Sequence, residues 1–247
     1  NHAMIRTITL IISSLMQTIT HNNRIIPVTG ISIQDALNSD IFLSWFNSID
    51  TSFTLNNIII ESVDTLHHNN DVFLIKLKVD LILPSGVPFI PTIILRHSAV
   101  AGLCVLTCEN KKYIVLVNQP RVPVGKVVYE LPAGMVDDGK NPAQVILREL
   151  EEEVQLQTLL GITADMIKPL GKSAYNSSPG FTNENVYLFY LDAEITKDQF
   201  QALQDRNTGL VEEGESITVK IIPYDDLTAY CNDVKTLSAL YLYEHLK

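Results

Sequence analysis

The sequence has little cysteine, few basic residues and no long apolar segment. Its 247 residues include three cysteines, 18 lysines and arginines, and one tryptophan. Three cysteines cannot form a disulfide framework, so Cys104, Cys108 and Cys231 are predicted to be reduced core residues of a cytoplasmic protein. No apolar run approaches the roughly 20 residues that a membrane-spanning helix needs, so no membrane partner is expected.

Acidic residues outnumber basic ones, 28 to 18, which gives a net charge of −10. Such a chain repels phosphate backbones unless it carries a local basic patch, and the richest basic stretch is the pair Lys111-Lys112. Nucleic acid is therefore not an expected partner. Hydrophobic residues make up 46% of the chain, which excludes intrinsic disorder and favours a globular fold.

Two regions differ in their pattern of apolar and polar residues. Residues 4–95 are predicted to form an N-terminal β-rich region, in which strands and polar turns follow one helix. The expected helix spans 33–49, and the expected strands span 55–63, 72–83 and 87–95.

Residues 96–247 contain short apolar segments typical of buried strands, and two segments that are predicted to be helices. The expected strands span 99–107, 113–118, 127–131, 186–191 and 217–222, and the expected helices span 142–154 and 234–246. Residues 109–112 are predicted to close a hairpin, and residues 132–134 to form a loop. This order of elements predicts an α/β (mixed α+β) fold, with a mixed sheet covered by helices.

The helix expected at 142–154 carries an unusual acidic face. Asn141 is a suitable N-cap and Pro142 suits the first helical position. Farther along, Glu149, Glu152 and Glu153 share one side of the helix, where like charges are mildly destabilising. Either the face is solvated, or a hard cation such as Mg²⁺ neutralises it, with Mn²⁺ as the alternative ion. Arg148, four residues before Glu152, is placed to neutralise one charge.

The segment before this helix favours the cation. Gly134 lies upstream of Arg148-Glu149-Leu150-x-Glu152-Glu153, and Leu156 lies downstream of it. The order and the spacing of these residues form one pattern. This pattern resembles the Nudix box, which has a glycine, five residues, a glutamate, seven residues and then Arg-Glu-apolar-x-Glu-Glu-x-Gly-apolar. Two positions depart from it. Lys140 replaces the first glutamate, which chiefly braces the loop, and Gln155 replaces the late glycine, which predicts an altered helix end. Asp137 or Asp138 is a candidate substitute brace.

The resemblance extends beyond the box to the branch that hydrolyses ADP-ribose and ADP-sugars. It rests on Leu131-Pro132-Ala133-Gly134, on Asn118-Gln119-Pro120-Arg121 and on residues 178–184, and the order of features is similar to plant-type ADP-glucose pyrophosphatases. It implies a Nudix αβα sandwich at 96–247 and an N-terminal region that forms a homodimer and encloses the substrate. It implies metal binding by Glu149, Glu152, Glu153 and the Ala133 carbonyl, with Arg148 and Glu152 in the catalytic set and Gly134 in the substrate site.

Four further residues are assigned through the same resemblance, each with a plain alternative. Glu184 is the candidate catalytic base, or an exposed loop acid. Arg121 is expected to meet a phosphate or the sugar, or to form a surface ion pair, and Arg96 is a weaker candidate of the same type. Glu130 is expected to contact metal or substrate, or to form a salt bridge at a strand end.

The expected activity is Mg²⁺-dependent hydrolysis of a nucleoside diphosphate sugar, with ADP-glucose and ADP-ribose as the leading substrates. An acidic protein needs cations to hold a diphosphate, which agrees with this reading. The alternatives are a UDP-sugar or dinucleotide pyrophosphatase, and a Nudix-fold nucleotide-binding module that has lost catalysis.

Other conspicuous residues are interpreted as structural. His67-His68 and the acidic group Glu212, Glu213 and Glu215 are expected to be solvated. The aromatic residues near Trp45 recur at helical spacing and are expected to serve core or dimer packing.

Overall fold

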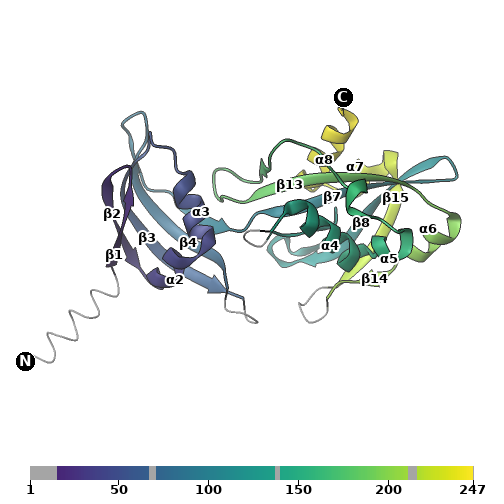
Figure 1. Cartoon of the computed structure of the whole chain (residues 1–247), viewed down its shortest axis with the longest axis horizontal. Helices are drawn as coiled ribbons and strands as arrows, with labels where there is room; N and C mark the ends of the chain where they lie inside the picture. Colours follow the sequence, from purple (N-terminus) through teal and green to yellow (C-terminus); the bar gives the residue numbers. More distant parts are fainter. Residues whose placement is uncertain (1–15, 67–70, 137–139, 211–215, 247) are drawn as a thin grey trace, which may run out of the picture. The chain divides into compact units, whose positions relative to one another are not determined.

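The computed structural model describes residues 16–66, 71–136, 140–210 and 216–246. They form two compact units (Figure 1). The first unit ends at His97 and also includes the later segment Ser178–Glu184, whereas the second comprises Ser98–Ser177 and Asn185–Lys247. A single boundary near residue 95 does not anticipate this return of the chain to the first unit.

In its described residues, the first unit is a six-stranded sheet with two short helices. Strands follow the order β1-β2-β3-β4-β5, and β6 also pairs with β4. Only β2 and β3 run parallel among these pairs. The strands are β1 (Met16–His21), β2 (Arg24–Gly30), β3 (Thr54–Thr65), β4 (Val72–Ile82), β5 (Pro88–Phe89) and β6 (Thr92–Arg96).

The helix expected at 33–49 is instead two helices, α2 (Ile33–Asn38) and α3 (Asp40–Ser48). The break is at Ser39, whose backbone is extended and whose hydroxyl accepts a hydrogen bond from Phe42 N at 3.2 Å. Ser39 thus ends one helix and caps the next. Both helices bury apolar side chains against β2, β3, β4 and β6, with Phe42 only 1% exposed.

The strand expected at 87–95 is also divided, into β5 and β6. Pro91 lies between them and has no N–H to donate to a ladder. The division therefore follows from the backbone chemistry of proline.

The second unit is built on a nine-stranded sheet in the order β11-β13-β7-β8-β15-β14, with β10, β12 and β9 attached to β7, β13 and β8. Strands β7 and β13 run parallel and the other pairs run antiparallel, so the sheet is mixed. The strands are β7 (Ala99–Cys108), β8 (Lys111–Arg121), β9 (Lys126–Glu130), β10 (Ala133–Met135), β11 (Lys168–Pro169), β12 (Tyr175–Asn176), β13 (Asn185–Glu194), β14 (Asn207–Thr208) and β15 (Ile217–Pro223).

Helices cover both faces of this sheet. Along β7 and β8 alternate side chains enter two separate cores, as the period of two in a strand requires. One core contains α4 (Pro142–Val154), α5 (Leu156–Leu160) and α6 (Lys197–Leu203), and the other contains α7 (Leu227–Tyr230) and α8 (Val234–Glu244). The predicted αβα sandwich with a mixed sheet is confirmed.

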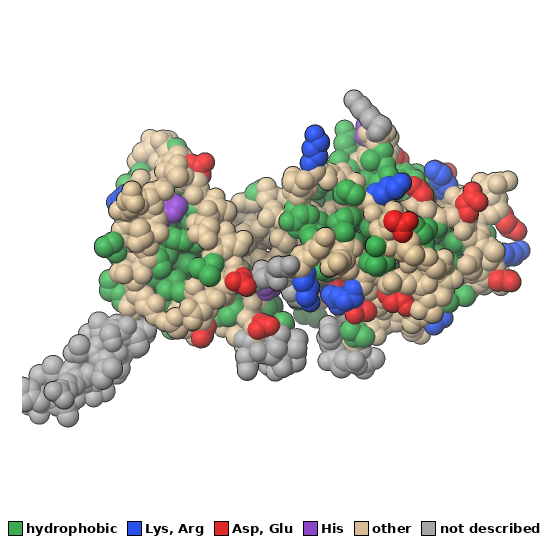
Figure 2. Space-filling view, in the orientation of Figure 1, with side chains coloured by type: hydrophobic (Ala, Val, Ile, Leu, Met, Phe, Trp, Pro, Cys, Tyr) green, Lys and Arg blue, Asp and Glu red, His purple; other side chains and the backbone are tan. Residues whose placement is uncertain are grey.

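The three cysteines are buried and carry free thiols, as predicted, and burial raises the pKa of Cys104 well above its usual value. Within the part of the chain that the structure describes, no helix has the length and apolarity needed to cross a membrane. On the face of the second unit shown in Figure 2, lysine and arginine side chains lie among acidic ones.

Candidate functional site

The acidic face predicted from the sequence lies on α4, whose start is fixed by local chemistry. Asn141 Oδ1 accepts a hydrogen bond from Ala143 N at 2.9 Å, and Pro142 occupies the first helical position. The helix is held on the sheet by a buried apolar stripe formed by Val145, Ile146, Leu150 and Val154. Because the stripe fixes the rotation of α4, it also fixes where the neighbouring carboxylates point.

Two of the three predicted metal-binding glutamates are buried. Glu149 is 7% exposed and Glu153 is 2% exposed, whereas Glu152 is partly exposed. Arg148 links the group, with Nη2 at 2.6 Å from Glu149 Oε1 and Nη1 at 2.6 Å from Glu152 Oε2. The predicted Arg148–Glu152 pair is confirmed. Buried carboxylates need such partners, because an unpaired charge is costly to desolvate.

Residues 132–134 were predicted to form a loop, and this prediction is wrong for Ala133 and Gly134. They belong to β10, in which Ala133 and Gly134 pair with Ala101 and Val100 of β7. Ala133 N donates a hydrogen bond to Glu153 Oε2 at 2.9 Å. A Cβ atom on Gly134 would lie 2.1 Å from Glu149 Oε1. Pairing with the sheet therefore holds this backbone directly against the two buried carboxylates.

This set of donors suits a hard divalent cation. Carboxylate and carbonyl oxygens are the ligands that such ions prefer, and Gly134 leaves the space that Glu149 occupies. In the arrangement described, Arg148 contacts Glu149 and Glu152, while Glu153 accepts the hydrogen bond from Ala133. Among the described residues, no three His, Cys, Asp or Glu side chains converge in a ready-made metal site. Arg148 is the positively charged partner of Glu149 and Glu152 in this arrangement.

The two departures from the box have different structural outcomes. Gln155 takes the left-handed conformation, with φ 61° and ψ 38°, and ends α4 as the missing glycine would. The expectation of an altered helix end is therefore wrong for the backbone. Lys140 is exposed, immediately before the N-cap. Asp137 and Asp138, the suggested substitute braces, lie outside the described residues.

Glu130 and Arg121 form an ion pair at the end of β8 and β9. Arg121 Nε lies 2.6 Å from Glu130 Oε1. Glu130 is buried, with 4% exposure, while the Arg121 side chain is 42% exposed. The salt-bridge alternative for Glu130 and the ion-pair alternative for Arg121 both describe this contact, and the Arg121 side chain is partly exposed to solvent.

Glu184 and Arg96 are brought together in the first unit. Arg96 Nε lies 3.1 Å from Glu184 Oε1, and Arg96 N donates to Asn183 Oδ1 at 2.9 Å. Ile94 N also donates to Phe181 O at 2.9 Å, which docks the segment on β6. The Glu184 side chain is 19% exposed, so it is not the fully solvated acid considered above.

The residues predicted to be structural are not part of the acidic cluster on α4. Trp45 packs with Phe42 and Phe46 in the first unit, which agrees with core packing. His67-His68 and the acidic group Glu212, Glu213 and Glu215 lie outside the described residues.

Sequence reasoning missed Lys235 and Thr236 at the start of α8. Lys235 Nζ contacts Glu130 Oε2, and Thr236 Oγ1 accepts from Leu131 N at 3.3 Å. These partners are 105 residues apart in each pair, so no local spacing could reveal them. The only available signal was Asp233 as the N-cap of a C-terminal helix.

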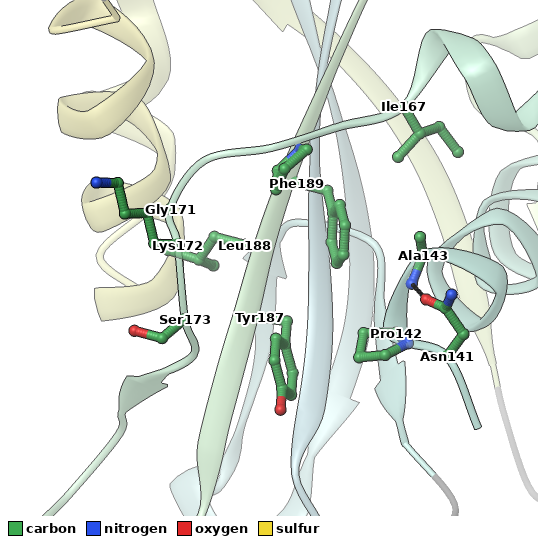
Figure 3. Close-up of a pocket in the computed structure, with 11 residues that line it drawn as sticks. Asn141, Pro142, Ala143, Ile167, Gly171, Lys172, Ser173, Tyr187, Leu188 and Phe189 are labelled. Carbon is green, nitrogen blue, oxygen red and sulfur yellow. Dashed lines mark hydrogen bonds between the residues drawn. The ribbon is translucent and has the colours of Figure 1, made fainter. Parts of the chain in front are cut away.

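A pocket of about 300 Å³ lies on the second unit beside the N-terminus of α4 (Figure 3). Tyr187 and Phe189 of β13 face Pro142 across it, while the Lys172 side chain points away. None of the predicted metal, catalytic or substrate residues is among those that line it. The pocket is therefore distinct from the carboxylate cluster.

Several known proteins are similar to this chain. "Nudix hydrolase 14, chloroplastic" of Arabidopsis thaliana is 33% identical over 231 residues, covering 88% of this chain and 74% of that protein. "ADP-ribose pyrophosphatase" of Bacillus subtilis is 32% identical over 156 residues, covering 61% of this chain and 78% of that protein. A solved structure titled "Crystal structure of ADP compounds hydrolase" has a TM-score of 0.48 and 18% identity, covering 77% of this chain and 94% of that one.

The family assignment rests on the first of these relatives and on one further match. A family model of the NUDIX domain matches residues 95–240. The match includes β10, α4 and the whole acidic cluster, and the plant relative covers most of the first unit as well. The resemblance predicted from the box is confirmed, and the chain belongs to the Nudix hydrolase family.

Proposed function

We propose that the protein hydrolyses the pyrophosphate bond of a nucleoside diphosphate sugar, giving a nucleoside monophosphate and a sugar phosphate, with Mg²⁺ as cofactor. The observation that carries the proposal is the pair of buried carboxylates, Glu149 and Glu153, held against the Ala133–Gly134 backbone. ADP-ribose and ADP-glucose are the leading substrates. Relatives named as an ADP-ribose pyrophosphatase and an ADP-sugar pyrophosphatase support this choice.

Each residue of the cluster has a proposed role. Glu149, Glu152, Glu153 and the carbonyl of Ala133 would hold Mg²⁺, or Mn²⁺ in its place, and such an ion neutralises the diphosphate and acidifies water. Arg148 neutralises the carboxylates and keeps their side chains ordered. Gly134 leaves room for the Glu149 carboxylate, because a side chain at position 134 would displace it.

The chemical step needs a base and an anion-binding group. Glu184 accepts the proton of the attacking water, whose oxygen bonds to phosphorus as the bridging P–O bond breaks. The leaving phosphate keeps the electron pair of that bond. Arg121 offers an exposed guanidinium for phosphate or sugar oxygens, and Arg96 orients Glu184 through their 3.1 Å contact. This contact makes Arg96 a positioning residue for the base as well as a candidate substrate contact.

Two alternatives are kept for specific reasons. The diphosphate could belong to a UDP-sugar or a dinucleotide, since no described contact selects adenine. A nucleotide-binding module without catalysis is the second alternative, because Lys140 and Gln155 depart from the box. The retained left-handed helix end at Gln155 favours the enzyme. A homodimer and a cytoplasmic location stay predictions.

A substrate panel with product identification tests the proposal. The protein is incubated with ADP-ribose, ADP-glucose, UDP-glucose and a diadenosine polyphosphate, each with Mg²⁺, with Mn²⁺ or with EDTA. We expect AMP and a sugar phosphate from an ADP-sugar, and no product with EDTA. Calorimetric titration with ADP-ribose is run in parallel, since binding without turnover would support the module and contradict the enzyme.

A further inference from the structure

The segment from Cys231, at the end of α7, to Thr236, in the first turn of α8, contacts three consecutive residues: Tyr129 and Glu130 of β9 and Leu131 directly after it. The Cys231 thiol donates to Tyr129 O at 2.9 Å, Lys235 Nζ contacts Glu130 Oε2, and Leu131 N donates to Thr236 Oγ1 at 3.3 Å. Thr236 is fully buried. The segment that leads into α8 therefore holds the backbone and the carboxylate that precede Pro132, Ala133 and Gly134.

Asp233 fixes this end of α8 in turn. Its Oδ2 accepts from Thr236 N at 3.2 Å and from Thr236 Oγ1 at 2.8 Å, and lies 3.0 Å from Lys235 Nζ. The ammonium of Lys235 is thus held between two carboxylates, with a side-chain exposure of 21%. Burial lowers the pKa of Lys235, but Glu130 and Asp233 outweigh it and raise the pKa above its usual value, so the ammonium stays charged.

Glu130 is the link between Lys235 and the surface. One of its oxygens contacts Lys235 and the other accepts from Arg121 Nε at 2.6 Å. A carboxylate contacted at both oxygens is restricted in its rotation, so the Lys235 contact helps to fix the oxygen to which Arg121 Nε is anchored. An arginine oriented before the ligand arrives loses less side-chain entropy on binding.

We infer that Lys235 is a positioning residue for the diphosphate sugar: it holds Glu130 so that Glu130 orients the guanidinium of Arg121 for substrate oxygens. The inference rests on the proposed function in one respect, namely that Arg121 meets the substrate. The coupling from Lys235 through Glu130 to Arg121 does not depend on it.

The first test measures the coupling without any substrate. The side-chain Nε–H signal of Arg121 is assigned by NMR from its absence in Arg121→Met. Lys235→Met is expected to shift or broaden this signal, and Lys235→Arg to restore it, because arginine can supply the same positive charge. Lys220→Met is the matched control, since Lys220 is also a half-buried lysine paired with an aspartate, Asp205. An unchanged Arg121 signal in Lys235→Met would overturn the inference.

The second test separates binding from chemistry. Lys235→Met is expected to raise KM for the ADP-sugar by about tenfold and to change kcat by less than about threefold, since a contact used equally in ground and transition states affects KM alone. In the Arg121→Met background, Lys235→Met should raise KM almost no further, because its effect on KM acts through Arg121. Additive effects, or a fall in kcat at constant KM, would overturn the inference.

The two proposals can fail separately. If the parent protein turns over no substrate but the Arg121 signal responds to Lys235→Met, the proposed function is wrong and the coupling stands. If turnover is normal and the signal does not respond, the inference is wrong and the proposed function stands. Melting temperatures of all variants show whether a kinetic change is only a loss of folded protein.

Discussion

Gly134 packs so closely on Glu149 that a Cβ atom at position 134 would lie 2.1 Å from Glu149 Oε1. The atom that would have to move is the end of a flexible side chain, whereas the Gly134 backbone is paired with Val100 of β7. A side chain at position 134 would therefore push the carboxylate away and leave the strand in place. The glycine of the box is required here by the space that a carboxylate occupies.

Gly134→Ala should consequently reduce activity far more than stability. Displacing the Glu149 carboxylate, a proposed metal ligand, by about 1 Å can cost roughly 100-fold in rate, whereas the fold should lose at most about 1–3 kcal/mol. Steady-state kinetics and chemical denaturation measure the two effects. Gly102→Ala is the control, because its Cβ would lie 3.1 Å from Ile146 and stress the same helix without touching a carboxylate. Equal activity losses in both variants would show that displacement of the Glu149 carboxylate is not the cause.

Glu153→Gln should lower turnover by orders of magnitude while the protein remains folded. The amide oxygen of glutamine can still accept the hydrogen bond from Ala133 N, but the negative charge that Glu153 would offer to the proposed cation is lost. Glu151→Gln on the same helix is the control, since Glu151 caps the next helix through Gln157 N and Thr158 N and has no proposed role in the site. Near-normal kcat in Glu153→Gln would remove Glu153 from the metal site.

The parts of the fold that local chemistry determines were predictable from the sequence. The start of α4 at Asn141-Pro142 was confirmed, and so was the hairpin, although its turn is only the left-handed pair Glu109-Asn110 and residues 111–112 already pair in β8. The helix break at Ser39 was missed, because the apolar period continues across it and masks the capping serine. Strand β10 was missed because proline and glycine suggest a loop, whereas its pairing with β7 is a long-range contact.

The candidate site shows the same division between local and long-range contacts. Spacing on one helix predicted the Arg148–Glu152 pair, which the structure confirms. Spacing could not predict that Lys235 contacts Glu130, because sequence distance carries no information about that packing. The partner of Glu184 was likewise hidden, since the post-box segment returns to the first unit and meets Arg96 there.

Gln155→Gly should stabilise the protein by about 1 kcal/mol, because a non-glycine residue in the left-handed region carries a steric cost. Gln155 ends α4 with φ 61°, a conformation that glycine adopts without that cost. Thermal and chemical denaturation give the difference. Gly161→Ala is the reverse case, with φ 70° and no atom within 4 Å of the added Cβ, and should destabilise by a similar amount. A less stable Gln155→Gly would show that the glutamine side chain contributes more than the backbone strain.

Glu184→Gln should reduce kcat by about 10²–10⁴ if Glu184 is the general base. The amide keeps the size of the side chain and can still accept from Arg96, so the segment should stay docked on β6. ADP-ribose binding measured by calorimetry should change little. Glu194→Gln, at the exposed end of β13, is the control for loss of one acidic charge. A variant with parental kcat would assign the base to another residue.

Lys140→Glu tests whether the departure from the box weakens the enzyme. Lys140 is exposed just before the N-cap of α4, where a cation meets the positive end of the helix dipole. Replacing it with glutamate should stabilise the protein by at most about 0.3–1 kcal/mol and restore the familiar pattern of charges. If the usual glutamate only braces the loop, kcat should remain within a few-fold of the parent value. Melting curves and steady-state kinetics at fixed Mg²⁺ measure both quantities.

If Lys140→Glu changes activity by more than a few-fold, the direction of that change identifies its cause. A rise in activity from near zero by several orders of magnitude would mean that the parent chain is a degenerate Nudix module, contrary to the proposed function. A large loss would mean that Lys140 contacts a substrate phosphate, so that the departure is an adaptation to the ligand. Lys140→Gln separates these cases, because it removes the positive charge without adding a carboxylate. A loss caused by a missing phosphate contact should appear in Lys140→Gln as well, mainly as a higher KM.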